Sequence, residues 1–297
     1  MKRLAVLAFC FAAFTSTLAQ SATPSYQGLW WNPGQSGWGM NIVHQGDILF
    51  ATWFTYDKDG SGMWLVMPSA QLDPSYGMGD TYGMYGMYGG GGSSMPTYSG
   101  TVYRTTGPAF DVATFDMTKV QATAVGTAQF QFFDANDGSF TYNVGTSSGT
   151  LSITRQVFGP MPACSLGGAA SGSPNFSDLW WRTGGSESGW GVNVAQEGDT
   201  IFATWFTYDG SGHGQWLVMP AGTKSGNLTW SGALYRTRGP AFDGMWDATK
   251  VVSTQVGTAT FAFSDAANGT FSATVDGASI TKPISRQVYA SPTTVCQ

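Results

Sequence analysis

Short runs of alternating hydrophobic and polar residues fill the chain, and Gly, Asp, Asn and Ser separate them. The runs are rich in β-branched and aromatic residues, which is typical of successive antiparallel strands. Alternation places Trp190, Val192 and Val194 on one face of such a run, which predicts a half-buried strand. In the second half of the chain the pattern predicts eight strands, near residues 179–182, 189–196, 200–208, 214–220, 228–237, 255–264, 269–275 and 280–288.

One predicted strand has the same sequence in both halves of the chain. The residues Ala-Thr-Trp-Phe-Thr-Tyr-Asp stand at 51–57 and again at 203–209. In this signature strand Trp205 and Phe206 point to opposite faces, so that both faces are apolar. One barrel interior cannot accept both. We therefore expect the outward face to pack on the other half of the chain, on a loop or on a ligand.

The two halves of the chain repeat each other, with residues 29–157 matching 179–288. The motifs Ser-Gly-Trp-Gly, Trp-Leu-Val-Met-Pro, Gly-Pro-Ala-Phe-Asp and Arg-Gln-Val follow in the same order in both halves. A repeat of this length is a domain and not a solenoid unit. We predict an all-β protein of two tandem antiparallel up-and-down barrels, each with about eight strands and an avidin- or lipocalin-like architecture.

The domain boundaries follow from the repeat. Residues 26–159 form the first predicted barrel and residues 176–297 the second, and the stretch 160–175, rich in Pro, Gly, Ala and Ser, is the linker. The first repeat carries an insert at about 71–97 that the second repeat lacks. Its Tyr-Gly-Met pattern cannot build a core, which indicates a flexible loop.

The first residues have the pattern of a secretory signal peptide. Lys2 and Arg3 precede an apolar run at 4–14, and small residues follow before residue 22. A membrane anchor is the alternative, but this run is far shorter than the roughly twenty residues that span a bilayer. No later stretch is long and apolar enough to span. We expect residues 1–22 to be removed and the protein to be secreted or periplasmic.

Charge and composition narrow the class of partner. Two of the 13 basic residues lie in the signal, which leaves 11 against 18 acidic residues. A mildly acidic surface repels phosphate backbones, so nucleic-acid binding is not expected. Two cysteines remain after the signal, Cys164 and Cys296, each just beyond the end of one repeat. An oxidising compartment favours a disulfide between them over two free thiols.

Aromatic residues are the main candidates for ligand binding, because flat rings bind sugar rings and apolar groups. The alternative is that they fill the barrels. Arg104 and Arg236 stand beside tyrosines, and Arg155 and Arg286 lie in the last strand of each repeat; they either pair with Asp57, Asp111 or their counterparts, or bind an anionic ligand group. The predicted binding residues are Trp38, Trp53, Trp64, Tyr103, Arg104, Trp190, Trp205, Trp216, Tyr235 and Arg236.

Metal binding and catalysis find little support. Thioethers suit Cu(I), but no His or Cys accompanies the methionines of the insert, which are Met78, Met84, Met87 and Met95. Asp57 and Asp59 begin like a calcium loop whose remaining ligands are missing, so a turn is expected. The histidines, His44 and His213, do not correspond between repeats, and no nucleophile elbow, phosphate loop or zinc spacing occurs. We predict no enzyme, no metal and no cofactor.

The motif series resembles a family of secreted repeat modules that is common in proteobacteria and functionally uncharacterised. The resemblance covers nearly the whole chain after the signal, twice, and implies no catalytic residues. The function predicted from the sequence is a secreted, non-catalytic protein that binds a glycan, an apolar small molecule or an envelope surface through aromatic patches. The alternative is a structural or adhesive envelope protein whose aromatic residues pack the two domains together.

Overall fold

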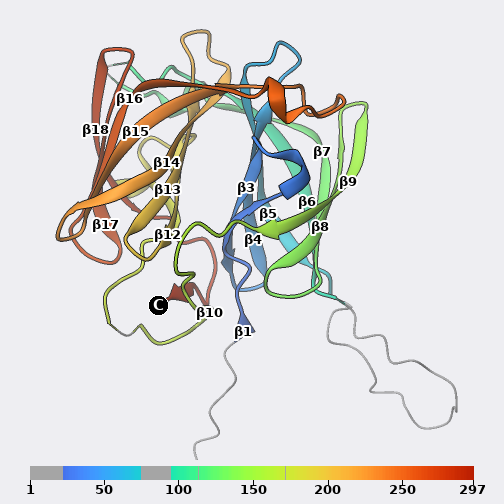
Figure 1. Cartoon of the computed structure of the whole chain (residues 1–297), viewed down its shortest axis with the longest axis horizontal. Coiled ribbons are helices and arrows are strands. Elements are labelled where there is room, and N and C mark those ends of the chain that lie inside the picture. Colours follow the sequence, from blue (N-terminus) through green and yellow to red (C-terminus); the bar gives the residue numbers. More distant parts are fainter. Residues whose placement is uncertain (1–22, 75–94, 113, 171) are drawn as a thin grey trace, which may run out of the picture.

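The computed structural model describes residues 23–74, 95–112, 114–170 and 172–297. They form two closed antiparallel barrels that lie side by side, with the second repeat on the left in Figure 1. The described residues contain no α-helix, only four short 3-10 turns. The prediction of an all-β protein with two eight-stranded barrels is therefore confirmed. The predicted signal peptide and most of the insert, with Met78, Met84 and Met87, lie outside the described residues.

Each barrel is built from strands that pair in sequence order and close between the first and the last. The first barrel consists of β2 (Gly28–Trp31), β3 (Gly39–Gln45), β4 (Ile48–Tyr56), β5 (Gly62–Leu72), β6 (Thr97–Thr106), β7 (Gln121–Phe132), β8 (Asp137–Val144) and β9 (Ser147–Arg155). The second consists of β11 (Asp178–Arg182), β12 (Gly191–Glu197), β13 (Thr200–Tyr208), β14 (Gly214–Gly226), β15 (Thr229–Arg238), β16 (Val252–Phe263), β17 (Asn268–Val275) and β18 (Ala278–Arg286).

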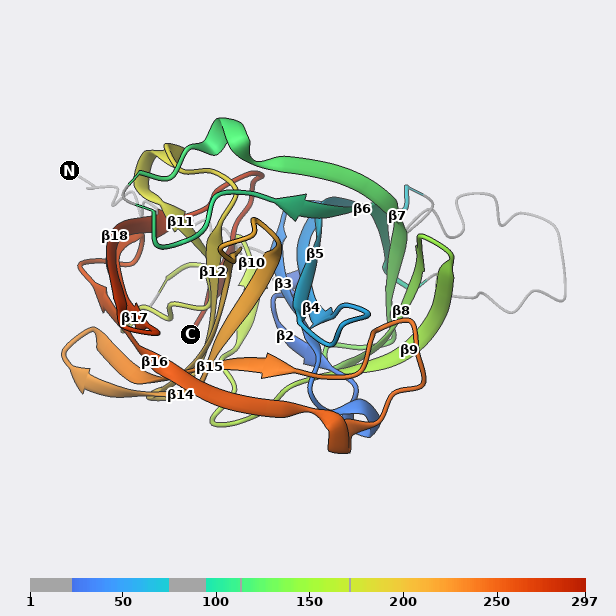
Figure 2. The same ribbon diagram turned by 90° about the horizontal axis from the view of Figure 1, so that it is seen from above.

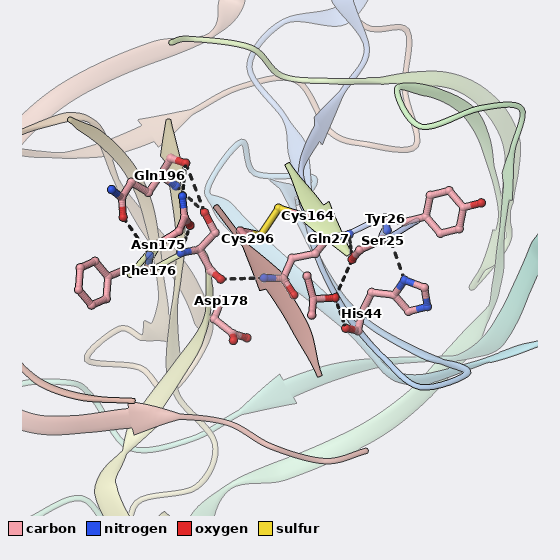
Figure 3. Close-up of a disulfide and its surroundings, with 12 residues drawn as sticks. Ser25, Tyr26, Gln27, His44, Cys164, Asn175, Phe176, Asp178, Gln196 and Cys296 are labelled. Atoms are coloured by element: carbon pink, nitrogen blue, oxygen red, sulfur yellow. Dashed lines mark hydrogen bonds between the residues drawn. A yellow bond between two sulfur atoms is a disulfide. The ribbon is translucent and has the colours of Figure 1, made fainter. Parts of the chain in front are cut away.

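A small third sheet, which the sequence did not predict, joins the first described residues, the linker and the C-terminal tail. Its strands are β1 (Thr23–Pro24), β10 (Cys164–Leu166) and β19 (Thr294–Cys296), in the order β1, β10, β19. Cys164 lies opposite Cys296, and the two form the predicted disulfide (Figure 3). The linker and the C-terminal tail are thereby tied together beside the start of the first barrel.

Aromatic side chains fill the barrels. In the first, Trp53 lies edge-on to Phe140, with ring centroids 5.1 Å apart, and in the second Trp205 and Phe271 repeat this contact at 5.1 Å. Apolar rings packed edge-to-face contribute more than their buried area alone. The cavity that remains inside the first barrel measures about 10 Å³. That is about the space of a single water molecule, so this cavity is too small for a ligand.

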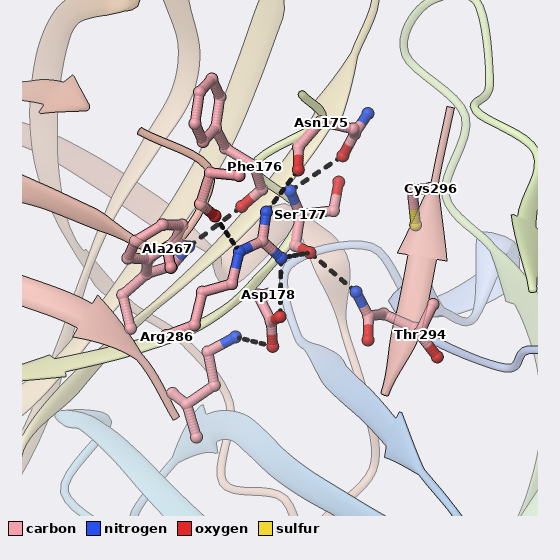
Figure 4. A network of polar contacts seen from close by, with 12 residues as sticks. Asn175, Phe176, Ser177, Asp178, Ala267, Arg286, Thr294 and Cys296 are labelled. Carbon is pink, nitrogen blue, oxygen red and sulfur yellow. Dashed lines mark hydrogen bonds and ion pairs between the residues drawn. The ribbon is translucent and has the colours of Figure 1, made fainter. Parts of the chain in front are cut away.

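The arginine of each Arg-Gln-Val motif anchors the first strand of its barrel. Arg286 donates to the Asp178 carboxylate at 2.7 Å and to the backbone carbonyls of Ser177 and Asn175 (Figure 4). Its guanidinium lies 5.0 Å from the centre of the Trp180 ring. Arg155 stacks in the same way on Trp30, at 4.8 Å, and donates to backbone carbonyls. Both arginines thus have internal partners. Those partners differ from the expected Asp57 and Asp111.

Candidate functional site: two grooves between the barrels

The signature strand buries both of its faces. Trp53 and Trp205 point into their own barrels, whereas Phe54 and Phe206 point at the other barrel. The Phe54 ring lies 5.0 Å from that of Trp216 and 6.4 Å from that of Phe206. Of the three partners expected for the outward face, the other repeat is the one found.

Two tryptophans hydrogen-bond across this contact in a reciprocal way. Trp64 donates its indole N–H to the carbonyl of Thr207 at 3.0 Å, and Trp216 donates to the carbonyl of Thr55 at 2.8 Å. Each bond therefore ties β5 or β14 to the signature strand of the other barrel. Both bonds satisfy a buried indole donor, and leaving such a donor unpaired would cost about 1–3 kcal/mol.

Each repeat also sends one loop across to the other. Figure 2 shows the segment between β6 and β7 (green) reaching over the second barrel, and the segment between β15 and β16 (orange) reaching over the first. Phe110 lies 5.2 Å, centroid to centroid, from Trp205, and Phe242 lies 5.3 Å from Trp53. The phenylalanine of each Gly-Pro-Ala-Phe motif thus caps the interior of the other barrel at one end.

The glycine of the same motif is required for steric reasons, because a side chain at this position would collide with a tyrosine of the other barrel. A Cβ on Gly107 would come within 2.6 Å of the Tyr208 ring, and a Cβ on Gly239 would collide with Tyr56 in the same way. These two tyrosines donate their hydroxyls to the carbonyls of Gly189 and Gly37, at 2.5 and 2.7 Å. Burial raises the pKa of both tyrosines to about 12, so they remain protonated donors at neutral pH.

Two grooves follow the contact between the barrels, and they are equivalents of each other. Groove A measures about 390 Å³ and groove B about 290 Å³. In each groove, one wall is formed by the first strands of one barrel together with the end of its last strand. The other wall is formed by the outer face of the other barrel. The groove A residues used below are Trp31, Trp38 and Gln156 from the first repeat, with Phe202, Trp216 and Pro220 from the second. Their groove B equivalents are Trp181, Trp190, Gln287, Phe50, Trp64 and Pro68.

The chemistry of the grooves is apolar and uncharged. No Asp, Glu, Lys, Arg or His belongs to the described lining of either groove. The polar groups are few: Gln156, Tyr235 and Ser253 are examples in groove A, and Gln287 in groove B. Concave sites of this size and lining, with a few polar groups that fix orientation, are typical of small-molecule sites.

The predicted binding residues lie in three places: in the barrel interiors, on the groove walls, or outside both. All six tryptophans are between 2% and 7% exposed. Trp53 and Trp205 belong to the barrel interiors, whereas Trp38, Trp64, Trp190 and Trp216 line the grooves. Tyr235 lines groove A, but its counterpart Tyr103 does not belong to the lining of groove B.

The two predicted binding arginines are outside the grooves. Arg104 pairs with Asp57, as one of the two expectations had it, and Arg236 pairs with Asp276 at 2.7 Å. Sequence reasoning missed Trp31 and Trp181, which are half-buried on the groove walls. The doubled tryptophan of Leu-Trp-Trp was the available signal, since alternation turns its second ring away from the barrel interior.

A third cleft, of about 390 Å³, lies beside the end of the second barrel and carries charged groups. Arg236 lies in it, already paired with Asp276. Arg238 donates to the carbonyl of Asp59 at 2.7 Å. The ring nitrogen of His213 is 3.9 Å from the Asp209 carboxylate, beyond hydrogen-bond distance, and both side chains are solvent-exposed. Among the described residues, no group of three or more His, Cys, Asp or Glu is placed to hold a metal ion.

The second histidine, His44, has a structural role. It is buried, and its Nδ1 accepts from the backbone N–H of Tyr26 at 3.3 Å (Figure 3). Its Nε2 lies 3.1 Å from the Tyr98 hydroxyl. Burial lowers the pKa of His44 to about 4, so the ring is neutral at pH 7. Its counterpart Gln196 accepts from the N–H of Phe176 at 2.9 Å. The same backbone contact is thus made by His in one repeat and by Gln in the other.

Fold and grooves together define a tandem β-barrel protein whose two repeats exchange loops. Comparisons with models of protein families, with curated proteins and with solved structures found no match for the chain. The resemblance to secreted repeat modules therefore stays a prediction. Among the described residues, none of the helical segments has the length and apolar character needed to cross a bilayer.

Proposed function

We propose that the protein is a non-catalytic binding protein that takes a neutral, mainly apolar small molecule into grooves A and B. The observation that carries the proposal is the pair of equivalent grooves, each open, aromatic-walled and uncharged. A close-packed contact between two barrels has no need of such space, because protein interiors and tight interfaces leave few voids larger than a water molecule. The barrel interiors are lined with packed aromatic rings and capped by Phe110 and Phe242, which favours the grooves as the site.

The neutral lining also bears on the kind of ligand. A charged ligand would lose its hydration in a groove that offers no opposite charge, which is costly. The apolar walls suit aromatic or alkyl groups, and Gln156 and Gln287 provide one amide each for orientation. A neutral glycan would use the same rings through its apolar sugar faces, and is the second ligand class to be tested.

We place the protein outside the cytoplasm, secreted or periplasmic. The disulfide between Cys164 and Cys296 supports this location, because such bonds form and persist in oxidising compartments. A soluble ligand or an envelope surface would meet the protein there.

Titration with the neutral fluorophore N-phenyl-1-naphthylamine, and separately with neutral oligosaccharides, tests the binding proposal. We expect two fluorophore sites per chain and a loss of affinity of at least about tenfold, or 1.4 kcal/mol, in the double variant Trp31→Ala, Trp181→Ala. The matched control is Phe133→Ala, since Phe133 is 49% exposed and lies outside both grooves. Binding that the double variant leaves unchanged, or no binding in either titration, would contradict the proposal.

The alternative function, a structural or adhesive envelope protein, also has an observation in its favour. The motifs that repeat without change supply the contacts between the barrels, including Trp64, Trp216, Phe110 and Phe242. Packing alone would account for those residues. The titration separates the two functions, because a purely structural protein leaves the grooves empty in both arms.

A further inference from the structure

The contact between the barrels has the properties of a symmetric dimer interface. In such an interface the same patch is used on both sides, so that residue i contacts residue j and j contacts i. The tryptophan bonds show this pattern, since Trp64 reaches Thr207 and Trp216 reaches Thr55. The side chains involved are identical in the two repeats.

The exchanged loops follow the same rule. The backbone N–H of Phe110 donates to the carbonyl of Tyr208 at 3.3 Å, and that of Phe242 donates to the carbonyl of Tyr56 at 3.1 Å. The N–H of Gly107 donates to Gly212 and that of Gly239 to Gly60, both at 3.1 Å. Such backbone hydrogen bonds require only that the two loops follow the same backbone path, and both loops contain the motif Gly-Pro-Ala-Phe-Asp.

One position has a different aromatic residue in each repeat, and both residues stack on the equivalent tyrosine of the other barrel. Phe115 of the first repeat stacks on Tyr208, at 6.3 Å and 27° between planes. Its counterpart Trp246 stacks on Tyr56, at 6.0 Å and 28°. Either ring therefore covers the tyrosine of the signature strand in the other barrel.

The segments that follow each barrel extend the exchange. After the first barrel, the N–H groups of Phe158 and Gly159 donate to the Glu197 carboxylate of the second, at 2.7 and 2.6 Å. After the second barrel, the N–H groups of Tyr289 and Ala290 donate to Oε1 of Gln45 in the first, at 2.9 and 3.1 Å. Gln45 and Glu197 hold equivalent positions, and both present an oxygen to two backbone donors.

We propose that this face is self-complementary, so that the partner it fits is a second copy of the same repeat. Pairing of the barrels then forms the two grooves in addition to stabilising the protein. Each groove takes one wall from each barrel, so a single repeat has neither groove. The proposal does not rest on the identity of a ligand, since it concerns the pairing of the barrels only.

Two symmetrised full-length chains test it. In one, residues 175–288 replace residues 25–157 ahead of the natural linker; in the other, residues 25–157 replace residues 175–288 ahead of the natural tail. A self-complementary face predicts that at least one of these chains is a compact monomer by light scattering and small-angle X-ray scattering, with one cooperative unfolding transition. Adding Trp→Ala at both copies of the position of Trp64 or Trp216 should lower its urea midpoint.

Three results would overturn the proposal. The first is failure of both symmetrised chains to fold. The second is an extended shape with two separate unfolding transitions, which means that the barrels form without pairing. The third is a compact chain whose urea midpoint the paired Trp→Ala changes leave in place, because its barrels then meet through another face.

Discussion

The indole N–H of Trp64 lies 3.0 Å from the carbonyl oxygen of Thr207, and this bond joins a strand of one barrel to the signature strand of the other. The same bond recurs from Trp216 to Thr55. Since both tryptophans also line the grooves, the residues that hold the barrels together also shape the space between them. Any change at these positions acts on stability and on the grooves at once.

Trp64→Phe should lower the free energy of unfolding by about 1–3 kcal/mol, because it leaves the buried carbonyl of Thr207 without its donor and removes ring volume. Urea denaturation followed by circular dichroism measures the change. Trp181→Phe is the matched control, since Trp181 is half-buried, lines groove B and has no hydrogen bond through its indole among the described contacts. Equal losses in the two variants would show that the Trp64 bond adds nothing.

The signature strand illustrates what the sequence could and could not predict. Alternation identified two apolar faces, with Trp53 on one and Phe54 on the other, and the structure has both buried. Alternation has no information on which element covers the outward face, because that depends on contacts distant in sequence. Cysteine count and position, in contrast, were enough to predict the bond between Cys164 and Cys296.

The candidate site was harder to predict for the same physical reason. Trp38 and Trp216 were predicted to bind ligand, and they line groove A from different repeats. The doubled tryptophan indicates that Trp31 faces away from the barrel interior, but a groove formed between two domains has no local sequence period, so the sequence does not show that Trp31 and Pro220 share one groove. The motif containing Phe242 was visible as a repeat, but its crossing into the other barrel is a property of the pairing.

Stability should depend on pH through His44. Its pKa is about 4 in the folded protein, because of burial, and 6.5 in the unfolded chain. The unfolded chain therefore binds the proton first as the pH falls. The contribution of the neutral ring is complete above pH 6.5, declines between pH 6.5 and 4, and is lost below, for a total of about 3 kcal/mol.

His44→Gln supplies the control for this dependence. Gln196 already makes the equivalent contact in the second repeat, accepting from Phe176, so Gln at position 44 should keep the bond to Tyr26. We expect the variant to lose most of the decline in unfolding free energy between pH 6.5 and 4, measured by urea denaturation at each pH. An unchanged pH profile in the variant would assign the decline to other groups.

Phe242→Ala should uncap the first barrel. The ring of Phe242 lies 5.3 Å from Trp53 and 6.2 Å from Tyr142. Its removal leaves a cavity, and loss of a buried phenylalanine ring costs about 3–5 kcal/mol. We expect a loss at or below the lower end of this range, because Phe242 is only half-buried.

The measurement for this variant is the unfolding free energy together with the emission spectrum of tryptophan. Water that enters above Trp53 should shift the emission to the red, and Phe110→Ala should do the same above Trp205, since the two contacts are equivalent. Phe133→Ala, on an exposed ring, controls for loss of an aromatic residue as such. A loss of stability without a spectral shift would mean that the barrel end stays closed.

The disulfide should stabilise the protein mainly through the unfolded chain. It closes a loop with a sequence separation of 132 residues, for which the chain-entropy relation gives about 5 kcal/mol. The double variant Cys164→Ser, Cys296→Ser should therefore unfold at a lower urea concentration, with its barrels otherwise unchanged. The remaining contacts of the tail, such as the hydrogen bond from Thr294 to the carbonyl of His44 at 2.7 Å, keep the ends of the small sheet in place.

The control is wild-type protein unfolded in the presence of a reductant, which should give the same urea midpoint as the variant. A variant midpoint equal to that of the oxidised protein would mean that the crosslink does not stabilise the protein by restricting the unfolded chain.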